Sequence, residues 1–245
     1  MTLFGLIGYP LGHSFSKKYF TEKFEKEKVV GFRYNLFPIQ SIDELPELIS
    51  NNPDLKGFNI TIPYKKDVFA YLDDTSNLPE GLNACNCVRI QNGKLIGYNT
   101  DVTGFRLSLR PLLKPVHTNA LILGNGGATA AVKHALTLSG ISYSVVSRTR
   151  GDHADLVYGD LNADVMNRYR LIINTTPLGT YPATSSYPDI PYDLITKDHL
   201  LYDLVYNPPL TEFLRKGQER GAVVKNGYDM LVIQAEESWK IWQQI

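Results

Sequence analysis

Amide, hydroxyl and ammonium groups follow one another closely between Asn59 and Lys66. Asn59 and Thr61 lie two residues apart in a predicted strand, so their side chains point to the same face. Lys65 follows Pro63, where we expect a helix to begin. Polar groups gathered at the carboxyl end of a strand indicate a binding site, in which an ammonium group could stabilise charge that develops on a ligand oxygen. Taken alone, a lysine at such a position is more often an exposed helix residue.

A carboxylate that could partner Lys65 follows a predicted β-hairpin. Two strands, Cys85–Gln91 and Leu95–Asn99, are joined by Asn-Gly, a strong signal for a tight hairpin turn. Asp101 lies just beyond the second strand, at the start of a helix. It could cap that helix, take part in a site, or do both. Since ligands of open α/β sheets bind beyond the carboxyl ends of strands, Lys65 and Asp101 could reach the same cleft.

Further polar side chains lie on or near two predicted helices. Ser14 and Ser16 are at the start of a helix expected from about residue 16 to residue 28, where hydroxyl groups either cap the helix or bind a carboxylate ligand. Capping by Ser16 is the simpler interpretation. Gln234 lies beside the apolar face of a last helix, predicted over 227–242, and could point into a cleft. Spacing alone favours solvent exposure for Gln234.

The centre of the sequence contains a strand, a glycine-rich turn and a helix in succession. Ala120–Leu123 is a short apolar run, three of the next four residues are glycine, and Ala128–Leu138 has the composition of a helix. Such a run is typical of a strand buried in a parallel sheet. Glycines let the backbone approach a pyrophosphate, and the helix N-terminus offers free N–H groups to that anion. The pattern indicates a dinucleotide-binding loop, although Thr129 stands where a third glycine is common.

Arginine follows the next predicted strand, Ser142–Ser147, at Arg148. In a fold that binds NAD, an acidic residue at this point holds the ribose hydroxyl, whereas arginine suits the 2′-phosphate of NADP. Without the glycine loop upstream, Arg148 would be interpreted as an ordinary surface residue. With that loop, Arg148 predicts a preference for NADP.

Composition places the chain among globular proteins. It has 245 residues, 43% of them hydrophobic, and a formal net charge of +0, so neither nucleic acid nor an anionic membrane surface is an expected partner. No apolar run has the length of a membrane span, and the beginning of the sequence resembles a first strand rather than a signal peptide. Cys85 and Cys87 lack the further ligands of a zinc site. We expect a cytoplasmic protein with no metal site.

Strands and helices alternate along most of the sequence, which predicts the α/β class. The length allows one large domain or two modest ones. An edge hairpin closes the first part, and residues 111–118 read as a connection into the second. The segment between Arg150 and Asn174 is short, so we expect one crossover of the nucleotide-binding sheet to be reduced.

Short motifs, taken in order, resemble those of the shikimate dehydrogenase family along nearly the whole chain. They are Gly8-Tyr-Pro10, His13-Ser-Phe-Ser16, Asn59-Ile-Thr-Ile-Pro-Tyr-Lys65, Ala84-Cys-Asn86, Asn99-Thr-Asp101, Leu123-Gly-Asn-Gly-Gly-Ala128, Arg148-Thr149, Asn174-Thr-Thr-Pro-Leu-Gly179, Asp203-Leu-Val-Tyr206 and Met230-Leu-Val-Ile-Gln-Ala235. Each motif is short, but their order from end to end is highly specific.

The resemblance implies an NADP-dependent oxidoreductase that reversibly reduces 3-dehydroshikimate to shikimate in aromatic amino-acid (chorismate) biosynthesis. It implies two α/β domains. Residues 1–103 and 228–245 form a substrate-binding domain with a mixed sheet, to which the last helix returns. Residues 104–227 form a Rossmann-like NADP-binding domain, and the site lies in the cleft between them. The partners are small molecules, and the protein is a monomer or a homodimer.

The same resemblance assigns roles to individual residues. Lys65 and Asp101 form the catalytic pair, and Ser14 and Ser16 hold the substrate carboxylate. The residues that hold the substrate hydroxyls are Asn59, Thr61, Asn86 and Gln234, and Tyr206 lines the site. The cofactor-binding residues are Gly124, Asn125, Gly126, Gly127, Ala128, Ser147, Arg148, Thr149, Leu204 and Gly227.

Five residues depart from the family's pattern: Cys85, Cys87, Ala130, Ser147 and Thr180. These departures bear on the affinity for the cofactor and on the preference for NADP more than on the reaction chemistry. Two alternatives therefore stay open. One is a relative that oxidises quinate or an amino-shikimate analogue and uses NAD. The other is a ligand-sensing module that kept the fold and lost turnover, against which the intact Lys65 and Asp101 argue.

Overall fold

The computed structural model describes residues 1–12, 14–151 and 154–244, so His13 of the second motif lies outside the described residues. The chain divides into two compact units. Unit 1 comprises Met1–Gly104 and Leu231–Ile245, and unit 2 comprises Phe105–Met230. The predicted boundaries, after residues 103 and 227, fall close to these.

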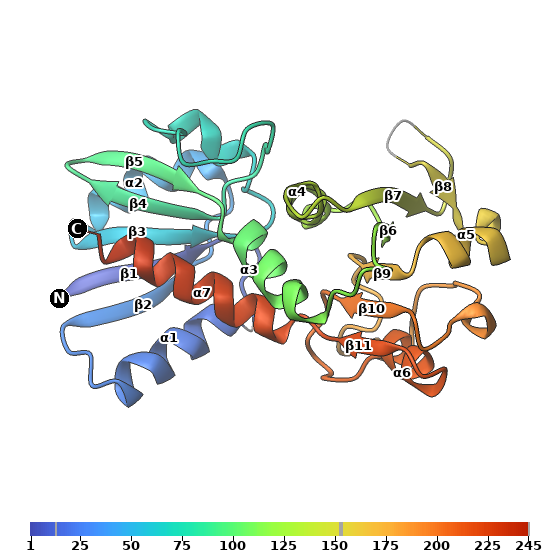
Figure 1. Cartoon of the computed structure of the whole chain (residues 1–245). Coiled ribbons are helices and arrows are strands. Elements are labelled where there is room, and N and C mark those ends of the chain that lie inside the picture. The colour runs from blue at the N-terminus through green and yellow to red at the C-terminus, as the bar shows by residue number, and fades with distance from the viewer. Residues whose placement is uncertain (13, 152–153, 245) are drawn as a thin grey trace. The chain divides into compact units, whose positions relative to one another are not determined.

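Unit 1 is built on a mixed sheet of five strands in the order β2-β1-β3-β4-β5 (Figure 1). β1 pairs in parallel with β2 and β3, whereas β3–β4 and β4–β5 are antiparallel. The hairpin turn has positive φ at both Asn92 and Gly93, as a two-residue turn of this sequence requires. The mixed sheet with an edge hairpin is as predicted. The strands are β1 Thr2–Ile7, β2 Phe32–Phe37, β3 Leu55–Ile60, β4 Cys87–Gln91 and β5 Lys94–Tyr98.

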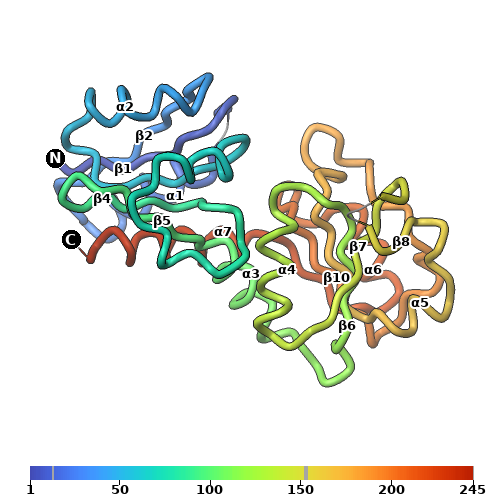
Figure 2. The backbone as a smooth tube through the Cα atoms, turned by 90° about the horizontal axis from the view of Figure 1, so that it is seen from above, coloured from blue at the N-terminus to red at the C-terminus, as the bar shows by residue number. Residues whose placement is uncertain are grey.

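Helices cover both faces of this sheet (Figures 1 and 2). They are α1 Phe15–Lys26, α2 Leu45–Asn51 and α7 Tyr228–Trp242, with short 3₁₀ turns at Ile42–Glu44 and Asp67–Tyr71; α3 Thr100–Leu109 begins at the end of this part of unit 1 and continues into unit 2. α1 and α7 pack on one face around Phe4, Phe20 and Trp242. α2 packs on the other around Leu45 and Phe58. The alternating side chains of the central strands therefore supply two separate hydrophobic cores.

Two local predictions for unit 1 are wrong. Ser14 rather than Ser16 caps α1, because the Ser14 hydroxyl accepts the backbone N–H of Lys17 at 3.2 Å. No helix begins at Pro63; the chain makes a turn there, and a 3₁₀ helix starts only at Asp67. Lys65 therefore belongs to a turn, and its surroundings differ from those of a lysine on a helix surface.

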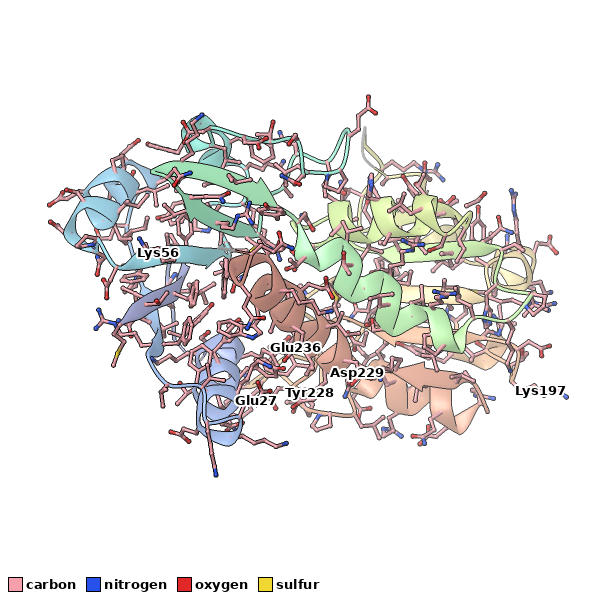
Figure 3. All side chains as sticks on the ribbon, turned by 60° about the vertical axis from the view of Figure 1, so that its left-hand side comes forward. Glu27, Lys56, Lys197, Tyr228, Asp229 and Glu236 are labelled. Atoms are coloured by element: carbon pink, nitrogen blue, oxygen red, sulfur yellow. The ribbon has the colours of Figure 1, made fainter. Side chains whose placement is uncertain are left out.

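An ion-pair cluster joins α1 to α7. The Lys23 ammonium lies 2.9 Å from a Glu236 carboxylate oxygen and 2.8 Å from one of Glu27, and the Tyr19 hydroxyl also donates to Glu236. Figure 3 labels the two glutamates on these helices. Only 9% of the Lys23 side chain is exposed, so this cluster is screened from water more than an ordinary surface pair. It fixes α7 against the rest of unit 1.

Unit 2 is built on a parallel sheet of six strands in the order β11-β10-β9-β6-β7-β8. Counted from β6, this is the 3-2-1-4-5-6 order of doubly wound dinucleotide-binding folds. The Rossmann-like prediction is confirmed. Its strands are β6 Asn119–Leu123, β7 Ser142–Ser147, β8 Leu156–Val157, β9 Leu171–Asn174, β10 Leu200–Asp203 and β11 Val223–Lys225.

The α-helices that lie wholly within unit 2 are α4 Thr129–Leu138, α5 Ala163–Arg168 and α6 Glu212–Glu219. α5 and α6 contribute Met166, Phe213 and Leu214 to a core that also contains Leu121 and Ile172 of the sheet. Between β7 and β8 the described residues form no helix, and β8 has only 2 residues. The crossover is reduced, as the short segment after Arg150 predicts.

Among the described residues, no helix is long and apolar enough to cross a membrane. The same residues contain no group of three or more His, Cys, Asp or Glu side chains that could hold a metal ion. Cys85 and Cys87 are both free thiols and fully buried.

We predict that the two tryptophans of α7 differ in their contribution to stability. Trp242 is fully buried, stacks on Phe4 at 4.6 Å and donates its indole N–H to the Val88 carbonyl at 2.9 Å. Trp242→Phe should lower the free energy of unfolding by about 2–3 kcal/mol, because it removes this hydrogen bond and part of a packed ring. Trp239→Phe is the control, since among the described residues the Trp239 indole ring makes aromatic contacts and no hydrogen bond. Equal losses in guanidinium denaturation would contradict the role assigned to the indole N–H.

Candidate active site

Lys65 and Asp101 form an ion pair in unit 1, with Lys65 Nζ 2.6 Å from Asp101 Oδ2. The side chains are 23% and 10% exposed. The turn that carries Lys65 is fixed by the backbone, because the Lys65 carbonyl accepts the N–H of Cys85 at 2.8 Å. Partial burial strengthens such a pair relative to one at the surface. Lys65 is thus not the exposed helix lysine that the sequence alone allowed.

Capping of α3 does not occupy Asp101. The cap is Asn99, whose Oδ1 accepts the N–H of Val102 at 3.0 Å while its Nδ2 donates to the Ala84 carbonyl at 2.7 Å. Asp101 lies in the first turn of α3. Its carboxylate is not needed to cap the helix and is free to pair with Lys65. The interpretation of Asp101 as the cap is therefore wrong.

Three predicted amide side chains, Asn59, Asn86 and Gln234, meet in one network, in which Asn86 is buried and the other two are partly exposed. Asn59 Nδ2 donates to the Asn86 carbonyl at 3.2 Å, and Asn86 Nδ2 approaches Gln234 Oε1 at 3.4 Å. Asn86 is 4% exposed. Its Oδ1 accepts the backbone N–H of Thr100 at 2.7 Å, so the orientation of this amide is fixed by a donor that cannot change. Residues from β3, from the segment before β4 and from α7 are thereby brought together.

The network contains three polar residues that the sequence did not indicate: Tyr34, Thr100 and Ser238. The Ser238 hydroxyl accepts from Asn59 Nδ2 at 2.9 Å, donates to the Gln234 carbonyl at 2.9 Å and lies 3.3 Å from Thr100 Oγ1. The Tyr34 hydroxyl donates to Asn59 Oδ1 at 2.9 Å. Burial raises the pKa of Tyr34 well above its usual value, so this phenol stays a donor. The one available signal was the spacing of Ser238 four residues after Gln234 on α7.

The two predicted serines differ in what they have left to offer a ligand. Ser14 uses its oxygen to cap α1, so its O–H remains as a donor. Ser16 is a partner of the Tyr34 hydroxyl, which connects it to the Asn59 network. Thr61 directly follows β3, and its backbone N–H extends the ladder to the Ile7 carbonyl at 2.9 Å. All three residues are partly exposed.

In unit 2 the glycine loop makes the turn from β6 to α4. Gly124 has φ of +100°, a conformation that favours glycine. Side chains added at Gly126 or Gly127 would meet nothing within 4 Å, so this part of the loop is open. No side chain caps α4. The Thr129 N–H donates to the Gly126 carbonyl at 3.0 Å, and the other N–H groups of the first turn are available to an anion.

Thr129, which stands in place of a third glycine, connects the glycine loop by hydrogen bonds to Thr175, directly after the neighbouring strand β9. It is 1% exposed, and its Oγ1 lies 3.3 Å from the Gly124 carbonyl and 2.9 Å from Thr175 Oγ1. Thr175 in turn donates to the Leu123 carbonyl at 2.9 Å. The departure from the common fingerprint thus adds hydrogen bonds and leaves the open side of the loop unchanged.

Arginines after β7 differ in their partners. Arg150 binds both carboxylate oxygens of Asp160, at 2.8 and 3.0 Å. Arg148 is exposed and forms no ion pair among the described residues. Its neighbours Ser147 and Thr149 are joined to each other, because the Ser147 hydroxyl donates to the Thr149 carbonyl. Arg148 is therefore the side chain of this segment that remains available for a phosphate.

The remaining predicted cofactor residues also meet. A side-chain carbon added at Gly227 would lie 2.2 Å from the Leu204 carbonyl oxygen, so only glycine allows this approach of two backbones. The Leu204 N–H continues the sheet to the Asn174 carbonyl at 3.0 Å. Tyr206 follows in the same loop, partly exposed, and burial raises its pKa.

A parallel sheet of this order with a glycine loop at the carboxyl end of its first strand defines a Rossmann-type dinucleotide-binding protein. Similarity to known proteins identifies the family within this class. Residues 6–88 match the family model described as the shikimate dehydrogenase substrate binding domain. A shikimate dehydrogenase (NADP(+)) of Methanococcus aeolicus is 37% identical over 257 residues, which cover 98% of this chain and 91% of the relative. The chain belongs to the shikimate dehydrogenase family.

Solved structures support the same family. The structure of shikimate 5-dehydrogenase from Thermus thermophilus, in complex with NADP(H) and shikimate, has a TM-score of 0.85 and 28% identity, and the match covers 100% of this chain and 94% of that one. A 5-ketofructose reductase of Gluconobacter is also similar, with a TM-score of 0.82, 25% identity and coverage of 100% and 93%. Since one fold serves different substrates, the side chains of the site must decide between them.

Proposed function

We propose that the protein is an NADP-dependent shikimate dehydrogenase that reversibly reduces 3-dehydroshikimate to shikimate. The observation that carries this proposal is the Lys65–Asp101 pair at 2.6 Å, in a unit that also holds the amides of Asn59, which is half-buried, and Asn86, which is buried. Family membership and the NADP(+) dependence in the names of the relatives support it. The intact pair favours an enzyme over a ligand-sensing module.

Lys65 and Asp101 divide the proton chemistry between them. The chemistry that bound NADPH supplies is a hydride for the ketone carbon of the substrate. The Lys65 ammonium has three N–H groups, one of which is held by Asp101. The others can donate to the ketone oxygen, stabilise its developing charge and deliver its proton. Asp101 orients the ammonium, and in the reverse direction the same lysine accepts the proton.

The amide network determines which substrate groups each side chain can bind. Both N–H groups of the Asn59 amide have partners, Asn86 O and Ser238 Oγ, whereas its Oδ1 accepts only from Tyr34 in the network described above. Asn59 therefore accepts a hydrogen bond from a substrate hydroxyl. Gln234 turns its Oε1 toward Asn86, which leaves its amino group as a donor to a hydroxyl oxygen.

The rest of the substrate is assigned by chemistry. The Ser14 hydroxyl, beside the N-terminus of α1, is a donor suited to a carboxylate, and the Ser16 hydroxyl can turn from Tyr34 to the same ligand. Thr61 binds a further hydroxyl, and Tyr206 lines the site. These side chains exclude water and orient the substrate through its carboxylate and hydroxyls. They therefore favour shikimate over simpler ketones and alcohols, which lack those groups.

For NADP, the residues present fit the cofactor. The open backbone at Gly126 and Gly127 and the uncapped start of α4 suit a pyrophosphate, together with Gly124, Asn125 and Ala128. Arg148, flanked by Ser147 and Thr149, suits the 2′-phosphate. Leu204 and Gly227 present backbone at the ends of β10 and β11. The proposed partners are small molecules, the proposed location is the cytoplasm, and the proposed state is a monomer or homodimer.

The first test is substrate and cofactor preference. Initial rates measured from NADPH absorbance should give a kcat/KM for shikimate with NADP at least about tenfold above that for quinate with either cofactor. The physical reason is that the side chains in place match the carboxylate and hydroxyls of shikimate, and Arg148 matches NADP. Equal or higher rates with quinate and NAD would assign the protein to the other relative.

The second test concerns the catalytic pair. Lys65→Ala should lower kcat roughly a hundredfold or more, because it removes the proton donor and the charge that stabilises the oxyanion. Lys66→Ala is the matched control, as Lys66 is exposed. Asp101→Asn should also lower kcat without loss of folding, since Asn99 provides the cap.

Steady-state kinetics with thermal melts on all three variants would decide the matter. Shikimate affinity should fall less than kcat in Lys65→Ala, because the carboxylate and hydroxyl contacts remain. A kcat close to that of the wild type in Lys65→Ala would remove the assignment of the pair, and with it the main argument for an enzyme.

The third test concerns the phosphate. A charge-assisted bond between Arg148 and the 2′-phosphate contributes on the order of 1.5–3 kcal/mol, so Arg148→Ala should weaken NADP binding roughly ten- to a hundredfold and leave NAD almost unchanged. Arg150→Ala makes the same charge change in the same segment, but Arg150 is already paired with Asp160; its effect should be clearly smaller. Equal weakening of NADP and NAD by Arg148→Ala would show a role in folding only.

A further inference from the structure

Asp203 is a fully buried carboxylate at the end of β10 that none of the steps above uses. It accepts three hydrogen bonds: from Asn174 Nδ2 at 2.9 Å, from the Val205 N–H at 3.0 Å and from Thr211 Oγ1 at 2.6 Å. No Lys, Arg or His of the described residues forms an ion pair with it. Burial raises the pKa of Asp203 to about 6. A buried carboxylate without a cation is costly, so its hydrogen bonds call for an explanation beyond stability.

The three donors come from three different segments. Asn174 ends β9, Val205 is the second residue after β10, and Thr211 is the N-cap of α6. Because Asn174 must turn its Nδ2 toward the carboxylate, its Oδ1 faces the other way, where it accepts from the N–H of Thr176 at 3.0 Å and from its hydroxyl at 2.6 Å. One carboxylate therefore fixes the start of both loops, the one after β9 and the one after β10.

These loops lie at a defined place relative to the dinucleotide site. β9 is the neighbour of β6 in the sheet, on the side opposite β7. The loop after β9 is bound to the glycine loop through Thr175, 2.9 Å from Thr129 Oγ1. In a sheet of this order a dinucleotide lies across the carboxyl ends of the strands. If the pyrophosphate lies at β6 and the adenosine phosphate at Arg148 after β7, the nicotinamide half falls on the β9 and β10 side.

We propose that Asp203 is a positioning residue that holds the loops after β9 and β10 in the conformation that receives the nicotinamide half of NADP. The inference rests on the proposed function for the identity of the cofactor. Asp203 acts through Asn174, Thr176 and Val205, whose backbone it fixes, and does not itself contact the reacting atoms. Its role depends on hydrogen-bond geometry and not on charge.

The experiment compares two ligands in the absence of substrate. Titration calorimetry measures NADP and adenosine 2′,5′-bisphosphate, which contains only the adenosine half. Asp203→Ala should weaken NADP at least tenfold and leave the bisphosphate within about twofold. Asp203→Asn should restore most of the NADP affinity, since an amide oxygen can still accept from Asn174 and Val205 while the Thr211 hydroxyl turns to accept. In the free protein, hydrogen exchange at the Thr176 and Val205 amides should rise in Asp203→Ala and stay near wild type in Asp203→Asn.

Tyr202→Phe is the matched control, because Tyr202 is the preceding residue of β10, is also fully buried and loses a hydrogen bond of 2.6 Å to Ser108. It should bind both ligands as the wild type does. If Asp203→Ala does not fold, Thr176→Val removes the hydroxyl bound to Asn174 and should show the same selective loss for NADP.

Three results would overturn the inference. The first is unchanged NADP binding in folded Asp203→Ala, or in Thr176→Val where Asp203→Ala does not fold. The second is an equal loss of both ligands in the variant used, and the third is a loss of NADP affinity in Tyr202→Phe as large as in that variant. A wild-type protein that binds no NADP would overturn the proposed function itself, which is a different outcome.

Discussion

The need to give every buried polar group a hydrogen-bond partner shapes both units of this protein. The buried polar residues include Asn86, Thr100 and Ser238 in unit 1 and Asn174, Asp203 and Thr211 in unit 2. An unpaired group of this kind costs about 1–3 kcal/mol. Among the described residues, Arg89 Nε is the one buried side-chain nitrogen or oxygen that lacks a partner. Satisfying the others restricts each site amide to a single orientation, which converts a requirement of stability into a rigid pattern of donors and acceptors.

The two units meet this requirement with different chemistry. Unit 1 places a charged pair, Lys65 and Asp101, where both side chains keep some exposure. Unit 2 surrounds Asp203 with neutral donors and excludes water from it. A partly exposed ion pair can exchange protons with a ligand, whereas a carboxylate saturated with neutral donors is suited to holding backbone in place. The location of the titratable groups thus separates the residues that can do chemistry from those that maintain geometry.

Much of the fold was accessible from the sequence because its signals are local. The Asn-Gly hairpin, the apolar run of β6 and the glycine loop each depend on a few adjacent residues, and all appear in the structure where they were predicted. Two of the wrong predictions concern neighbouring residues that compete for the same role as helix cap. Ser14 rather than Ser16 caps α1, and Asn99 rather than Asp101 caps α3, because backbone geometry at the helix start selects one of two chemically equivalent candidates.

Tyr34, Thr100 and Ser238 were beyond the reach of local patterns for another reason. Tyr34 and Ser238 contact Asn59 across 25 and 179 positions of sequence, and no periodicity encodes such distances. Lys65 illustrates the same limit: its turn is held by the Cys85 backbone, and nothing in its own segment indicates that it is half-buried. The resemblance of motifs supplied the list of site residues, and the folded chain supplies the reason that several of them lie together.

Unit 1 is discontinuous in sequence, and this affects how the chain is made. Its last element, α7, follows the whole of unit 2 along the chain. On the ribosome, Phe4 and Phe32 of the sheet and Phe20 and Phe24 of α1 therefore remain without their cover of Ala235, Trp239 and Trp242 until unit 2 has been synthesised. An uncovered aromatic surface is prone to association. Unit 2, continuous in sequence, can fold during that interval, so the nascent chain acquires its nucleotide-binding sheet before its other half is complete.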